Sequence, residues 1–149
     1  MLKNPKSQLV YLLRLLEYCG KIIVYTNGLN NYKEFLEKES QLHFNASLTL
    51  LVQIGEQTLK LDETIKEQAA AVPWHMVKGF RNIAVHEYVY VDAQKVFEIC
   101  TIHIPELRNS IEKFIKEAVS KNLLSPFELK LSVGSIFYMQ VRFEELITE

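Results

Sequence analysis

Residues 78–92 concentrate the side chains of this chain that could carry out phosphodiester chemistry. The segment reads K-G-F-R-N-I-A-V-H-E-Y-V-Y-V-D and holds a guanidinium at Arg81, an amide at Asn82, an imidazole at His86 and two phenols. Arginine offers a fixed positive fork to phosphate oxygens, and histidine, with an ordinary pKa of about 6.5, exchanges a proton at neutral pH. RNA supplies its own nucleophile, the 2'-hydroxyl, so its cleavage needs only proton transfer and charge stabilisation. A metal ion is therefore optional for this chemistry, and we expect no cofactor.

The spacing of Arg81 and His86 limits how one helix can present them together. At about 100° per residue they lie roughly 140° apart around a continuous helix, whereas Asn82 and His86 share a face. The two groups can converge where the chain bends near residues 88–90, or where a second copy of the chain meets the first across a two-fold axis. A symmetric pair would also double the local positive charge.

The same residues have an ordinary structural interpretation. In it, Arg81 forms a salt bridge with a neighbouring acid, His86 caps a helix end and Tyr88 fills a gap in the core. An arginine and a histidine at this spacing often arise by chance in a helix. On composition alone, the structural interpretation is therefore the favoured one.

Composition places the chain among single-domain proteins of the reducing cytoplasm. Its 149 residues are 48% hydrophobic, enough for one full core. The 17 basic and 18 acidic residues give a net charge of -1, so any contact with RNA must be local or assembled from several subunits. Cys19 and Cys100 lie far apart, which argues against zinc or redox chemistry, though not strictly against one disulfide. No stretch of the sequence is apolar enough to cross a membrane.

Apolar residues recur at helical spacing over most of the chain. The pattern predicts helices from Ser7 to about residue 27, over 32–38 and over 41–60. The stretch 61–72 is charged and then alanine-rich, and it leads to Pro73-Trp74, where the helix that carries Arg81 should begin. Asp92 is a plausible N-cap for a last long helix, which runs to about residue 121. At Pro105 we expect either a kink or two abutting helices.

The C-terminal residues 123–149 read as an extension of a bundle domain that spans residues 1–122. Ser125-Pro126-Phe127-Glu128 matches a helix-capping box, and Gly134 should break the helix that follows. Residues 136–147 are too apolar for a free tail, so we expect this extension to pack on the bundle or to serve assembly.

The fuller pattern around Arg81 resembles a known family. The string Arg81-Asn82-x-x-x-His86-x-Tyr88 resembles the HepT-like ribonuclease toxins of the HEPN superfamily, found in type VII (HepT/MntA) toxin–antitoxin systems. The resemblance covers about residues 7–120. It includes the flanking pairs and two further triplets, namely Pro73-Trp74, Gly79-Phe80, Val91-Asp92, Ile54-Gly55-Glu56 and Pro105-Glu106-Leu107.

This resemblance implies an all-α, up-and-down bundle of about five helices, paired as a homodimer or a higher even oligomer. The two R-N-x-x-x-H segments would meet in a cleft that cuts RNA without metal. Arg81 would bind or stabilise the scissile phosphate, Asn82 would orient it, and His86 would act as acid or base. Glu56 matches a family position near the cleft and is expected to hold Arg81, although a plain surface carboxylate explains it equally well.

The resemblance also implies a partner, an antitoxin of the minimal nucleotidyltransferase (MntA) type. It would transfer AMP from ATP to Tyr88, which the motif spacing favours over Tyr90. Phosphate charge beside Arg81 would pair with the cation and occupy the space that an RNA phosphate requires. The alternative function is a non-catalytic subunit that binds substrate for the nucleotidyltransferase, with Arg81 and His86 only holding the dimer together.

Overall fold

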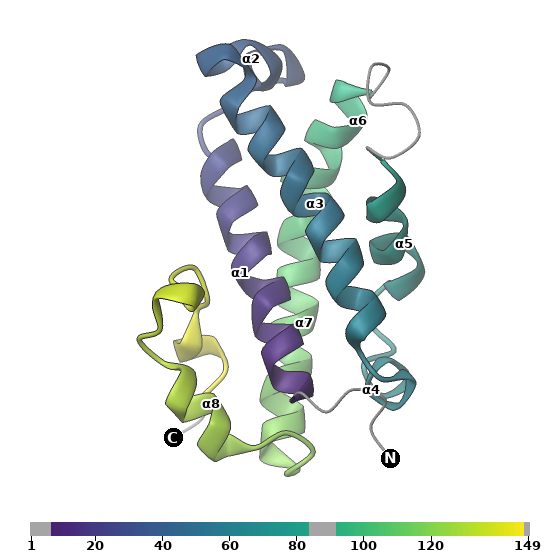
Figure 1. The fold of residues 1–149 in the computed structure, drawn as a ribbon, viewed down its shortest axis with the longest axis vertical. Coiled ribbons are helices and arrows are strands. Elements are labelled where there is room, and N and C mark those ends of the chain that lie inside the picture. Colours follow the sequence, from purple (N-terminus) through teal and green to yellow (C-terminus); the bar gives the residue numbers. More distant parts are fainter. Residues whose placement is uncertain (1–6, 84–91, 148–149) are drawn as a thin grey trace.

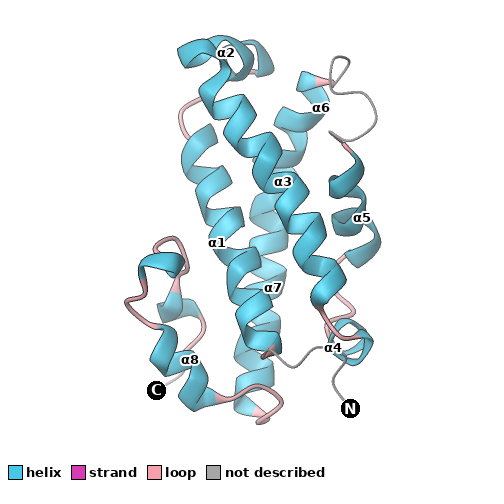
Figure 2. Ribbon diagram, in the orientation of Figure 1, coloured by secondary structure: helices cyan, strands magenta, loops and turns pink. Residues whose placement is uncertain are grey.

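The computed structural model of the protein describes residues 7–83 and 92–147, and within them the only regular elements are helices (Figure 2). The long helices α1 (Gln8–Thr26), α3 (Leu42–Lys60) and α7 (Ile104–Ser120) lie side by side (Figure 1). Their facing sides form a core of fully buried aliphatic side chains, which includes Leu12, Leu16, Leu51, Ile54, Leu107, Ile111 and Ile115. The all-α, HEPN-like helical bundle expected from the sequence is confirmed.

Side-chain caps mark the N-terminal ends of the first two helices. Ser7 accepts a hydrogen bond from the backbone N–H of Leu9 at 3.2 Å, and α1 ends just before Gly28, whose φ of +81° suits glycine. The short helix α2 (Tyr32–Glu37) is capped by Asn31, which accepts from the N–H of Glu34 at 3.0 Å. Both helices match the ranges predicted from the sequence.

The connection between α3 and the next predicted helix contains a short helix that the sequence pattern does not predict. Helix α4 (Glu63–Gln68) occupies part of the charged stretch, and α5 (Trp74–Gly79) begins after Pro73 as expected. The indole Nε1 of Trp74 donates to the carbonyls of Lys66 at 3.2 Å and Ala69 at 3.0 Å. These two bonds tie the start of α5 to α4 and fix its position beside α3.

The last long helix consists of two abutting helices, one of the two predicted outcomes, and the irregular turn between them lies before Pro105 rather than at it. Asp92 accepts from the N–H of Lys95 at 3.1 Å and so caps α6 (Ala93–Glu98), as expected. A π-helical turn, Ile99–His103, joins α6 to α7. Pro105 lies in the first turn of α7 and has no N–H for the carbonyl one turn before it, so the distortion falls in the preceding turn.

The C-terminal extension folds back on α1 and α7, on the side of the bundle opposite α5 (Figure 1). Ser125 caps α8 (Pro126–Ser132) by accepting from the N–H of Glu128 at 3.1 Å, and Gly134 follows with a φ of +86°. The backbone N–H of Gln140 donates to the buried Glu17 at 2.5 Å. The extension thus packs on its own bundle, and the domain boundary at residue 122 stays a prediction.

Two contacts hold the end of the extension, while its outer side remains apolar. Arg142 binds Glu112 through Nε at 2.9 Å and Nη2 at 2.6 Å. Five large apolar side chains of the extension are more than two-thirds exposed, namely Phe127, Leu131, Ile136, Phe137 and Met139. In the described part of the chain, no helix combines the length and apolar character that a membrane span requires.

Candidate functional site

A close contact between α3 and the 3-10 turn η2 (Phe80–Asn82) sets the position of Arg81. A Cβ atom on Gly55 of α3 would lie 2.8 Å from the backbone nitrogen of Arg81 and 2.9 Å from its Cβ. Real Cβ atoms do not approach other heavy atoms so closely, and a backbone nitrogen cannot swing aside as the tip of a flexible side chain can. Gly55 is therefore the residue type that this contact requires.

The rod formed by α5 and η2 has one face in the core and one face in solvent. Gly79 and Phe80, at the junction, have right-handed helical φ and ψ, so the two elements continue one another. Val77 and Phe80 are 0% and 3% exposed and pack into the core beside α3. Burial of this face leaves both Arg81 and Asn82 exposed.

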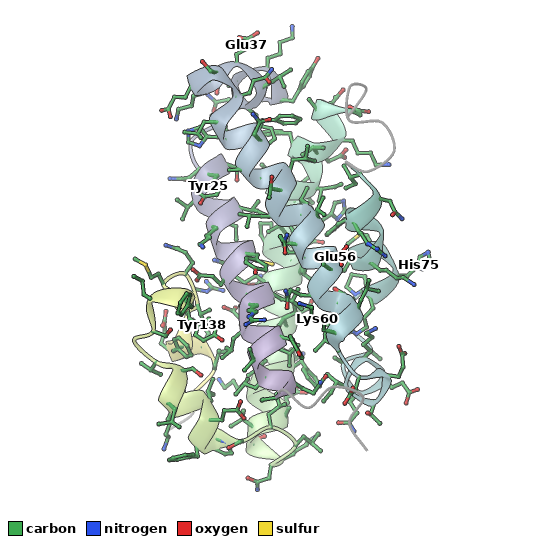
Figure 3. The ribbon with its side chains drawn as sticks, viewed as in Figure 1. Tyr25, Glu37, Glu56, Lys60, His75 and Tyr138 are labelled. Carbon is green, nitrogen blue, oxygen red and sulfur yellow. The ribbon has the colours of Figure 1, made fainter. Side chains whose placement is uncertain are left out.

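An ion pair with Glu56 of α3 orients the Arg81 side chain. Its Nε lies 2.7 Å from Oε1 of Glu56, and the two side chains are 46% and 40% exposed. Figure 3 shows Glu56 on the side of α3 that faces α5. A pair so open to water contributes about 0–1 kcal/mol to stability, so its main effect is on orientation. Nε is the innermost guanidinium nitrogen, and the two terminal amino groups lie beyond it, where an anion can reach them.

The structure brings together three of the five site residues that the sequence predicts. Arg81 and Asn82 are neighbours in η2, and Glu56 contacts Arg81. His86 and Tyr88 lie outside the described residues, as does Tyr90, so their placement stays a prediction. The Glu56–Arg81 pair agrees with the family resemblance and equally with the structural interpretation of Arg81 as half of a salt bridge.

The two cysteines and His43 lie in surroundings that give them a structural role. Burial raises the pKa of both Cys19 and Cys100 to about 12, so neither thiol ionises at neutral pH. His43 packs edge-on against Tyr25, with ring centroids 6.4 Å apart, and lies 3.5 Å from Glu39. Among the residues that the structure describes, no three His, Cys, Asp or Glu side chains are grouped to hold a metal ion.

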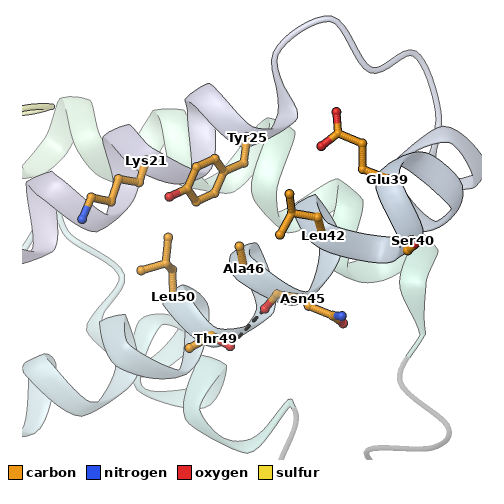
Figure 4. A pocket seen from close by; sticks show the side chains of 9 residues that line it. All are labelled: Lys21, Tyr25, Glu39, Ser40, Leu42, Asn45, Ala46, Thr49 and Leu50. Atoms are coloured by element: carbon orange, nitrogen blue, oxygen red, sulfur yellow. Dashed lines mark hydrogen bonds between the residues drawn. The ribbon is translucent and has the colours of Figure 1, made fainter.

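A pocket of about 540 Å³ lies between α1 and the first turns of α3 (Figure 4). Lys21 and Tyr25 line it from α1, and Asn45 and Thr49 from α3; the Thr49 hydroxyl donates to the Asn45 carbonyl at 3.0 Å. The lining extends along α3 to Leu50, which precedes Glu56 by about 9 Å at the usual helical rise of about 1.5 Å per residue. Neither Glu56 nor Arg81 lines this pocket.

Comparison with known proteins identifies relatives along most of the chain. The sequence model of a family described as "Ribonuclease HepT-like" matches residues 15–114. A protein of Methanocaldococcus jannaschii named "Putative RNase" is 31% identical over 119 residues, which are 79% of this chain and 96% of that protein. A second protein of that organism, also so named, is 30% identical over 78% of this chain and 99% of its own length.

A bacterial relative gives a similar match. The protein of Caldanaerobacter subterraneus subsp. tengcongensis that carries the same name is 29% identical over 80% of this chain and 98% of its own length. No solved structure gives a significant match. Residues 123–149, which form the C-terminal extension, lie beyond the span that the family model matches.

Replacing Gly55 with alanine should destabilise the protein. The added methyl group must push η2 away from α3, at a cost of about 1–3 kcal/mol in the free energy of unfolding. Gly79→Ala is the matched control, because a Cβ there would meet nothing within 4 Å; it should leave stability unchanged or raise it by up to about 1 kcal/mol. Urea unfolding followed by fluorescence of Trp74, the only tryptophan, measures both. Equal stabilities for the two variants would contradict the contact.

Proposed function

This chain belongs to the HepT-like ribonuclease family, and we propose that it is the toxin of a toxin–antitoxin pair, an endoribonuclease that cuts cellular transfer or messenger RNA without a metal ion. The observation that carries the proposal is the placement of Arg81. Its backbone is held against α3 at Gly55, and its side chain is held at the surface by Glu56. Such a cation, exposed but oriented, suits a phosphate that must enter from solvent.

The reaction that these groups support is an attack of the RNA on its own backbone. His86 takes the proton of a 2'-hydroxyl, and the freed oxygen bonds to the adjacent phosphorus. The bond from phosphorus to the 5'-oxygen breaks, and that oxygen receives a proton from the solvent or from an imidazolium. The products are a 2',3'-cyclic phosphate and a 5'-hydroxyl. Arg81 stabilises charge on the phosphoryl oxygens, and Asn82 orients them.

The active unit in this proposal is a homodimer. A chain with a net charge of -1 has little overall attraction for RNA, so pairing two Arg81 segments in one cleft supplies the local positive charge. Pairing also lets His86 of one copy approach Arg81 of the other. Within one chain, the helical spacing keeps these two residues apart. The free, buried thiols of Cys19 and Cys100 accord with a cytoplasmic location, which we include in the proposal.

The antitoxin in this proposal is a nucleotidyltransferase that modifies Tyr88. Transfer of AMP joins the α-phosphorus of ATP to the phenol oxygen and releases pyrophosphate. The new phosphodiester carries a negative charge two residues from His86 in the sequence. Because Arg81 is oriented toward solvent, it can pair with that charge and is then no longer open to RNA.

Loss of Arg81 or His86 should abolish RNA cleavage. We expect the wild-type dimer to cut total RNA in the presence of EDTA, and Arg81→Ala and His86→Ala each to reduce the rate at least about a hundredfold. Lys33→Ala, on the exposed side of α2, is the control and should cut like the wild type. Circular dichroism and light scattering establish that each variant is a folded dimer. Cleavage that persists in both site variants would come from a contaminant, and the proposal would then be wrong.

Modification should fall on one tyrosine. Co-expression with the cognate nucleotidyltransferase should add AMP to the wild type and to Tyr90→Phe, but not to Tyr88→Phe, as read by intact mass. The modified wild type should no longer cut RNA. An adduct that remains in Tyr88→Phe and disappears in Tyr90→Phe would assign the modification to the other phenol.

A further inference from the structure

The segment that carries Arg81 is locally basic in a chain that is not basic overall. Residues 68–86 contain no aspartate or glutamate, although acidic residues slightly outnumber basic ones in the whole chain, 18 to 17. The described part of this segment carries His75, Lys78 and Arg81. Glu56 of α3 pairs with Arg81, and Glu67 directly precedes the segment in the sequence. In the described part of α5 and η2, Lys78 is therefore the cation whose charge has no recorded partner.

The polar side chains of this rod follow one another along a single exposed stripe. At about 100° per residue, His75, Lys78 and Asn82 fall within an arc of about 60°, and Arg81 lies about 60° beyond Lys78. All four residues are exposed. Lys78 precedes Arg81 by about 4.5 Å of helical rise, and His75 precedes Lys78 by the same distance. The stripe thus offers a cation about one helical turn from Arg81, within reach of a neighbouring phosphate.

The core holds this stripe in a fixed orientation. Val77 and Phe80 anchor the opposite face, and the indole of Trp74 is bonded to two carbonyls of the preceding segment. The rod cannot turn without breaking these contacts. Figure 3 shows His75 at the outer edge of α5, pointing away from the bundle.

Lys78 has no ionic partner among the described residues, whereas two lysines at the α4 end of the bundle have recorded contacts. Lys66 pairs with Glu63 at 3.4 Å, and Lys60 lies 5.9 Å from the ring centre of Tyr11. Lys78 is exposed on the same rod as Arg81 and has no comparable contact within residues 7–83 and 92–147. An unpaired lysine keeps its full charge available to an external anion.

We infer that the exposed stripe of α5 and η2 is the path of the RNA backbone into the proposed site, and that Lys78 binds the phosphate adjacent to the one at Arg81. This inference rests on the proposed ribonuclease function. A single-stranded segment fits better than a duplex, because a strand can follow one short helix while its bases stay unpaired. Lys78 contacts the backbone alone, so its contribution to binding is independent of base sequence.

The test uses a short single-stranded RNA that is fully 2'-O-methylated, so that it binds without being cut. Fluorescence anisotropy gives its Kd for the full-length protein at salt concentrations from about 50 to 200 mM. Lys78→Gln should raise Kd roughly three- to tenfold at low salt and lower the slope of log K against log salt by about 0.7, the effect of one lost phosphate contact. Lys78→Arg should bind like the wild type.

Lys130→Gln is the matched control, since it removes the same charge from an exposed site on α8, across the bundle from α5. It should leave both Kd and slope at wild-type values. Cleavage of unmodified RNA supplies the second readout, in which Lys78→Gln should raise KM and leave kcat nearly unchanged. Equal melting temperatures would exclude a folding effect.

The outcomes separate this inference from the function on which it rests. If the wild type cuts and binds RNA but Lys78→Gln behaves like Lys130→Gln, the path is wrong and the ribonuclease proposal stands. If RNA binding is unchanged but Lys78→Gln weakens binding of the nucleotidyltransferase, the stripe is a protein-docking surface and the inference is overturned. If the wild type neither cuts nor binds RNA, both proposals fail.

Discussion

The backbone of η2 lies against α3 at Gly55, so close that no side chain fits between them, and the exposed polar groups nearby depend on this contact. It fixes the distance between two helical elements through atoms that cannot rearrange. The neighbouring residue of α3, Glu56, then lies within reach of the Arg81 side chain. One turn of α3 thus supplies both the space for the Arg81 backbone and the acid that orients its side chain.

The energies of these interactions assign them different roles. Burial of Val77 and Phe80 contributes about 1.5–3 kcal/mol for each side chain and holds the rod of α5 and η2 in place. The half-exposed Glu56–Arg81 pair contributes about 1 kcal/mol at most. Core packing therefore sets the position of the Arg81 guanidinium, and the ion pair with Glu56 sets its orientation. Because this ion pair is weak, the Arg81 guanidinium can exchange its contact with the Glu56 carboxylate for a contact with a phosphate.

Much of the fold could be predicted from the sequence because its signals are local. Helices α1 and α3 show long apolar stripes, and Asp92 and Ser125 are caps recognised by residue type. Helix α4 could not be predicted, because its six residues bury only Ile65 and show no period. The distortion before Pro105 was expected one turn later, since a proline shows that a hydrogen bond is missing but not which turn widens.

The site was predicted less from spacing than from family resemblance. Spacing alone left Arg81 as an ordinary surface residue, and the resemblance placed Glu56 beside it, as the structure does. The reason for Gly55 could not be seen in one sequence, because a close approach between two backbones leaves no periodic pattern. The stripe through Lys78 also depended on knowing which face of α5 is buried. The roles of His86 and Tyr88 stay predictions.

The most direct test of the whole account is the single-turnover rate of RNA cleavage by Gly55→Ala at saturating RNA, at a temperature where the variant is fully folded. Moving η2 away from α3 displaces Arg81, and misplacement by about 1 Å can cost about a hundredfold in rate. Ile115→Val, in the core on α7, should lower stability by about 0.5–1.5 kcal/mol and cut like the wild type. A folded Gly55→Ala variant that cleaves at the wild-type rate would contradict the account.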